Sequence, residues 1–125
     1  MKRFFLLPLT LLLLLLSGVA RAEVRDYRPE DVPNVQKQDY RRFVSDPEGY
    51  FTPEERSEID RALYDLRERH TVEAVLVVLP AIENDDPETF TEELFRLWGL
   101  GKAKDDNGLL ILYVTQRRRL IRFET

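Results

Sequence analysis

The residues with the clearest chemical potential lie in one short segment, residues 102–108, which reads Lys-Ala-Lys-Asp-Asp-Asn-Gly. Asp105, Asp106 and Asn107 offer hard oxygen ligands of the kind that Ca²⁺ and Mg²⁺ prefer. They are also ordinary turn formers, because Asp and Asn bond to nearby backbone and the glycine that follows supplies positive φ. The spacing alone therefore leaves a cation site and a simple turn both open. An EF-hand is excluded, since the alternating acidic ladder and its closing glutamate are absent.

A helix with a well-marked start is predicted over residues 52–71. Thr52 provides the N-cap, Pro53 occupies the first helical position, and Glu55 completes a capping box with Thr52. Apolar residues recur at intervals of three and four and form one stripe: Ile59, Ala62, Leu63 and Leu66. We expect this stripe to face the core and the charged side of the helix to face solvent.

A second helix is predicted over residues 85–99. Asp85 or Asp86 caps it, Pro87 takes the first helical position, and Gly99 ends it. Its apolar stripe consists of Phe90, Leu94, Leu97 and Trp98. We expect the tryptophan to belong to the core, and a ligand-stacking role is the alternative.

Three strands are predicted, over residues 72–80, 108–115 and 119–125. The first contains a continuous, largely β-branched apolar run, which suits a strand covered on both faces in a parallel sheet. Strand, helix and strand in succession predict a crossover between parallel strands. A tight turn at residues 116–118 then sends the third strand back antiparallel to the second. The predicted fold class is α/β with a mixed, partly parallel sheet.

This topology places the acidic segment relative to the rest of the chain. The third strand ends at the edge of the sheet where the second begins, so Glu124 is expected to return beside Asp105, Asp106 and Asn107. The second predicted helix ends at the same edge, and the negative end of its dipole favours cations. A Ca²⁺ or Mg²⁺ site is therefore one interpretation of the segment. The acidic pair that starts the second helix lies at the opposite edge, too far away to contribute.

Residues 1–22 have the features of a secretory signal peptide. Lys2 and Arg3 precede an apolar run, and Ala-Arg-Ala at positions 20–22 predicts a cleavage site. An uncleaved N-terminal anchor is the alternative, and both place the domain outside the cytoplasm. Removing this segment takes three of the 19 basic residues, which leaves 16 against 23 acidic ones, a net charge of about −7. Nucleic-acid binding is therefore not expected, and the absence of cysteine excludes disulfides and thiol chemistry.

The polar residues 23–45 show no helical period, and we expect them to form an extended leader. Residues 46–125 would then form the folded domain.

Residues 94–125, "LFRLWGLGKAKDDNGLLILYVTQRRRLIRFET", closely resemble the core of the TPM domain. In this family a short helix ends in Trp-Gly, an apolar residue and Gly, and Asp-Asn-Gly then precedes an aliphatic strand, a charged hairpin and another strand. The residues that match this pattern are Trp98, Gly99, Gly101, Lys104, Asp106, Asn107, Gly108, Arg118 and Glu124. Upstream, "VSDPEGYFTPEE" is similar to the opening of the family pattern, with Tyr50 and Phe51 where leucine is usual. The resemblance covers residues 32–125.

The resemblance implies an α/β/α sandwich on the outer side of a membrane, in the periplasm or the cell envelope. Many members carry a C-terminal membrane helix. The family pattern continues past Thr125, so we expect the C-terminal part of the domain to be missing here and membrane proximity to come from that part. Divalent-cation binding and acid phosphatase activity are attributed to some members. Others are accessory modules for the assembly or repair of membrane proteins.

Two function classes therefore stay open, a metal-dependent phosphomonoesterase and a non-enzymatic binding module. For catalysis the chain offers no cysteine and no Asp-x-Asp pair, and its single histidine, His70, lies at a helix end. What remains is a carboxylate-held cation that activates water. Its candidate ligands are Asp105, Asp106, Asn107 and Glu124, with Asp106 as the catalytic residue and Lys104 as a contact for a phosphate oxygen. A pocket with convergent basic groups would favour the enzyme, and a shallow acidic site would favour the module.

Overall fold

The main sheet has four strands. In the computed structural model, which describes residues 24–101, 107–116 and 119–124, these strands are β2 (Val44–Ser45), β3 (Glu73–Leu79), β5 (Gly108–Val114) and β6 (Arg119–Glu124), in the order β2-β3-β5-β6. The first three run parallel, and β6 pairs antiparallel with β5. A smaller parallel sheet joins β1 (Asp26–Tyr27) to β4 (Ala81–Ile82). The predicted mixed sheet is thus confirmed.

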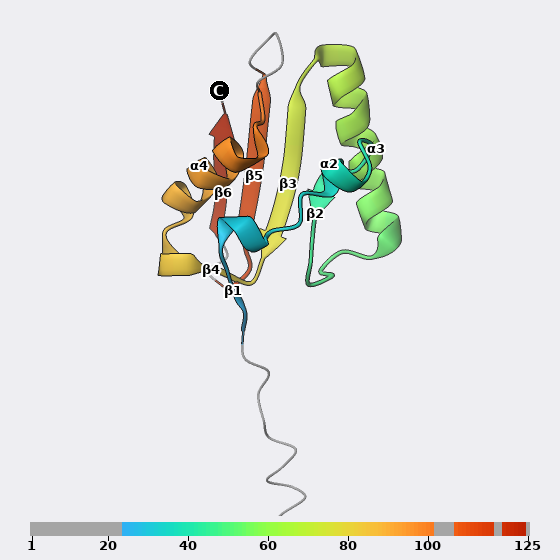
Figure 1. Cartoon of the computed structure of the whole chain (residues 1–125). Helices are drawn as coiled ribbons and strands as arrows, with labels where there is room; N and C mark the ends of the chain where they lie inside the picture. The colour runs from blue at the N-terminus through green and yellow to red at the C-terminus, as the bar shows by residue number, and fades with distance from the viewer. Residues whose placement is uncertain (1–23, 102–106, 117–118, 125) are drawn as a thin grey trace, which may run out of the picture.

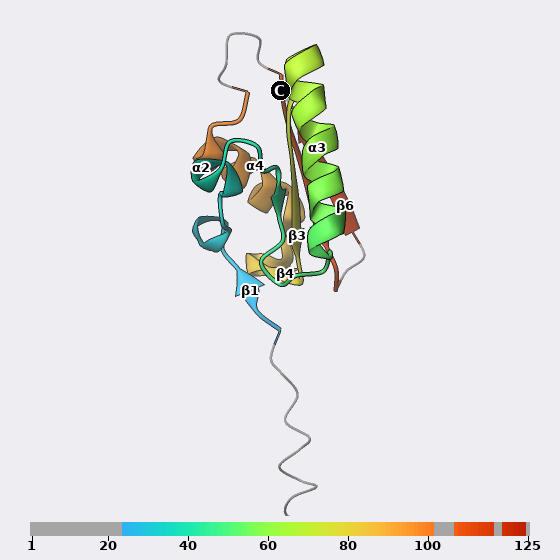
Figure 2. The same cartoon turned by 90° about the vertical axis from the view of Figure 1, so that its right-hand side faces the viewer.

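Helices cover both faces of the main sheet (Figures 1 and 2). On one face lies α3 (Pro53–His70), and on the other lie α4 (Pro87–Trp98) and the short α2 (Val35–Gln38). The described residues also include the 3-10 turns η2 (Pro29–Asp31), which packs against α4, and η3 (Glu83–Asp85). The molecule is therefore the expected α/β/α sandwich. Within the residues described, no helix has the length and apolar character needed to cross a membrane.

The start of α3 is fixed as its sequence predicts. The Thr52 hydroxyl accepts from the Glu55 backbone N–H (3.2 Å), and the Glu55 carboxylate accepts from the Thr52 N–H (3.0 Å). The latter bond holds the pKa of the Glu55 carboxyl below its usual value. The apolar stripe is less buried than expected, because Ile59, Leu63 and Leu66 are half-buried and Ala62 is exposed. α3 lies mainly over β2 and β3, which form one half of the sheet.

α4 begins with a predicted cap, since the Asp86 carboxylate accepts from both the backbone N–H and the hydroxyl of Thr89 (3.2 and 2.7 Å). The predicted apolar stripe is wrong for one member. Leu97 is 57% exposed, and Phe95 is buried in its place. The two residues lie about 200° apart around the helix, so only one of them can face the sheet. The buried side chains of α4 are Pro87, Phe90, Thr91, Leu94 and Phe95. Trp98 is half-buried and packs against the core.

The core lies between α4 and the two central strands. β3 and β5 contribute alternate residues to it, namely Val75, Val77, Leu79, Leu110, Leu112 and Val114. Ala74 and Val78, on the other face of β3, are buried as well, as the apolar run of this strand predicts. The equivalent face of β5 differs from expectation, because Leu109, Ile111 and Tyr113 are only half-buried. The position of α3 over β2 and β3 explains this difference.

The segment expected to be an extended leader packs instead as part of the domain. Residues 24–45 contain β1, η2, α2 and β2. Most of its large apolar side chains are almost completely buried, with Tyr27 1% and Phe43 0% exposed, whereas Val24 and Tyr40 are exposed. The Asp60 carboxylate of α3 also accepts from the backbone N–H groups of Phe43 and Val44 (2.7 and 3.1 Å). A few well-spaced apolar anchors thus order a segment whose overall composition is polar.

Candidate functional site

The two ends of the parallel strands form two distinct edges of the sheet, and each carries polar residues. The amino edge is where β3 and β5 begin and where α3 and α4 end. Of the predicted site residues there, Asn107 and Glu124 lie within the described part of the chain. Lys104, Asp105 and Asp106 lie outside it.

The register of β6 brings Glu124 to the start of β5. Its partner on β5 is Leu109, two residues after Asn107. The exposed Glu124 carboxylate forms an ion pair with Arg122 of the same strand (3.5 Å). The Asn107 side-chain amide donates a long bond to the Thr71 hydroxyl at the end of α3 (3.4 Å), and the Asn107 backbone carbonyl accepts from the Glu73 N–H (2.8 Å). The predicted convergence of β6 on the start of β5 is therefore confirmed.

The glycines of this edge have a structural role. Gly99 and Gly101 both have positive φ (65° and 70°), so they turn the chain away from the end of α4. Gly108 lies so close to them that a Cβ atom there would fall 2.7 Å from the Gly101 nitrogen and 2.8 Å from the Phe95 ring. The glycine spacing of this motif is thus explained by close backbone packing.

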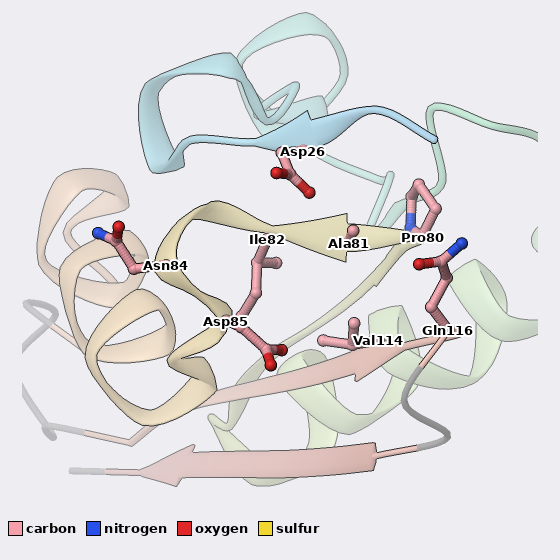
Figure 3. Close-up of a pocket in the computed structure, with 8 residues that line it drawn as sticks. All are labelled: Asp26, Pro80, Ala81, Ile82, Asn84, Asp85, Val114 and Gln116. Carbon is pink, nitrogen blue, oxygen red and sulfur yellow. The ribbon is translucent and has the colours of Figure 1, made fainter. Parts of the chain in front are cut away.

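The carboxyl edge, where β3 and β5 end, contains a cavity of about 310 Å³ (Figure 3). Its lining residues are Asp26, Pro80, Ala81, Ile82, Asn84, Asp85, Val114 and Gln116. In Figure 3 the Asp26 and Asp85 side chains flank β4, and Gln116 lies near Pro80. The backbone bond from the Gln116 N–H to the Pro80 carbonyl (3.2 Å) joins the chain after β5 to the chain after β3. Ligands of open α/β sheets bind in this position, outside the carboxyl ends of parallel strands.

The polar side chains that line the cavity are carboxylates and amides. Asp26 and Asp85 supply carboxylates, and Asn84 and Gln116 supply amides. Asn84 and Asp85 both adopt positive φ (59° and 50°), a conformation that is uncommon outside glycine and is often found at functional sites. None of the lining residues is basic, and none carries a hydroxyl, thiol or imidazole group. Across the described ranges, no three His, Cys, Asp or Glu side chains gather closely enough to hold a metal ion by themselves.

Neighbouring loops support the cavity from the side. The Tyr27 hydroxyl donates to Glu48 (2.5 Å), and burial together with this bond raises the pKa of Tyr27 to about 12. The Asp46 carboxylate accepts from the backbone N–H groups of Tyr50 and Phe51 (2.9 and 2.8 Å). The Thr115 hydroxyl, just after β5, donates to the Tyr50 hydroxyl oxygen (3.0 Å). The loop after β2 is thus connected to both β1 and β5.

Sequence reasoning missed this second site. It assigned the acidic pair before Pro87 to helix capping, and only Asp86 has that role. Asp85 lines the cavity instead. The sequence does contain one indication of this site, because polar residues that directly follow parallel strands meet at the carboxyl edge of the sheet. For Asp26 no such signal existed, since a two-residue strand has no period to detect.

The fold and its polar cavity define an open α/β/α domain with a candidate ligand site at the carboxyl edge. Comparison with protein families matches residues 44–125 to the TPM domain, so the chain belongs to this family. The resemblance stated from sequence is thereby confirmed. Comparison with curated proteins finds no match.

A solved structure with the same fold is similar to this chain. It is the solution NMR structure of the N-terminal domain of a protein from P. gingivalis, with 40% sequence identity and a TM-score of 0.73. The match covers 80% of this chain and 64% of that one, so the present chain spans less than two thirds of the related structure.

Proposed function

We propose that this TPM domain is an exported, non-enzymatic module of the cell envelope that binds a divalent cation weakly and supports a membrane-protein partner. The observation that carries the proposal is the polarity of the carboxyl-edge cavity, which presents carboxylates and amides and no basic side chain among its lining residues. Such a lining attracts cations and disfavours a phosphate ester, which is itself an anion.

The carboxylates and amides of this lining are the types of group that Ca²⁺ or Mg²⁺ takes as ligands. Both are hard cations that take carboxylate and amide oxygens, and Ca²⁺ tolerates the irregular geometry of loop ligands better. No three of the described acidic side chains gather closely enough to hold an ion, so water would occupy most of its coordination positions. We therefore expect a dissociation constant of roughly 10⁻⁴–10⁻³ M, the range of weak extracellular modules.

Titration of the mature protein, residues 23–125, with CaCl₂ tests the site. Amide resonances of residues 81–85 and 116 are expected to shift together, and Asp85→Asn should weaken the response. Hydrolysis of p-nitrophenyl phosphate should stay at the uncatalysed rate with or without CaCl₂ or MgCl₂. Metal-dependent hydrolysis that Asp85→Asn abolishes would contradict the non-enzymatic proposal. Arg117 and Arg118, which follow Gln116 in sequence and lie outside the described residues, would then be the first candidates for phosphate contacts.

A metal-dependent phosphomonoesterase at the amino edge is the second candidate. The pairing of Leu109 with Glu124 favours it, because this register brings a carboxylate to the start of β5. Its ligands would be Asp105, Asp106, Asn107 and Glu124, and the cation would lower the pKa of a bound water. Lys104 would contact a phosphate oxygen of the substrate. In that case CaCl₂ should shift the amides of Asn107, Gly108 and Glu124, and Asp106→Asn should abolish hydrolysis.

A further inference from the structure

We draw no further inference here: the strongest candidate, the half-buried apolar side of β5 that lies beyond α3 (Leu109, Ile111 and Tyr113), carries no proposal because nothing in the described part of the chain shows what would cover it.

Discussion

At the residue scale, Gly108 shows how one position limits the amino edge. A methyl group there would overlap the backbone of Gly101 and the ring of Phe95. We expect Gly108→Ala to lower the free energy of unfolding by about 1–3 kcal/mol, the usual cost of overpacking. Urea denaturation measures this loss.

Gly49→Ala is the comparison for Gly108→Ala, because it introduces backbone strain without a steric clash. Gly49 has positive φ (70°), and a Cβ atom there would meet nothing within 4 Å. Its substitution should cost about 1 kcal/mol through conformation alone. A loss below about 0.5 kcal/mol for Gly108→Ala would show that the loop and α4 can move apart.

Tyr27 also makes stability depend on pH. Its pKa rises from 10.0 to about 12 in the folded protein, mainly through burial and then through Glu48. A raised pKa means that folding favours the protonated tyrosine. The stability that Tyr27 contributes in this way is therefore complete below pH 10 and is lost as the pH rises from 10 to 12. Absorbance at 295 nm should therefore show one of the five tyrosines ionising near pH 12, about two pH units above the ordinary value of 10.0.

The Tyr27→Phe variant identifies the late-ionising group. It should remove that titration step and leave the steps of the other tyrosines unchanged. If the late step persists in the variant, a tyrosine other than Tyr27 is responsible for it.

At the scale of elements, Arg67 connects α3 to the chain before β2. Its guanidinium lies 4.9 Å from the ring centre of Phe43, 5.6 Å from that of Tyr40 and 5.3 Å from that of Tyr64. It also donates to the Tyr40 carbonyl (2.9 Å). Cation–π contacts and a charged hydrogen bond of this kind together contribute about 2 kcal/mol.

We therefore expect Arg67→Met, which keeps the apolar stem, to lower the midpoint of urea denaturation by an amount equivalent to about 2 kcal/mol. Arg61→Met is the control, because Arg61 is exposed on the same helix. Equal losses in the two variants would mean that Arg67 contributes no more than an ordinary surface residue.

Elements with local signals could be predicted from sequence, and elements that depend on distant partners could not. The caps at Thr52 and Asp86 involve neighbours three residues away, so their positions follow from sequence. β1 exists only because it pairs with β4, more than fifty residues later in the chain. The cavity depends on this pairing, and so it was missed, whereas the return of Glu124 followed from a hairpin of nearby strands.

At the scale of the whole molecule, the proposed export and the position of β1 depend on the same stretch of chain. Cleavage after Ala22 would leave Glu23 as the first residue, and β1 begins three residues later at Asp26. The predicted cleavage site thus leaves β1 complete. Cleavage even five residues further on would remove Tyr27, whose ring is almost completely buried, and with it the whole of β1.

We therefore expect the exported protein to begin at Glu23, and N-terminal sequencing of protein recovered from outside the cytoplasm checks this. Replacing both Ala20 and Ala22 by bulky residues should block processing, because the cleavage site requires small side chains at these two positions. Recovery of Met1 on the wild-type protein would mean that the segment remains as an anchor. The cavity would then lie within a few residues of the membrane, because Asp26 follows the apolar segment so closely.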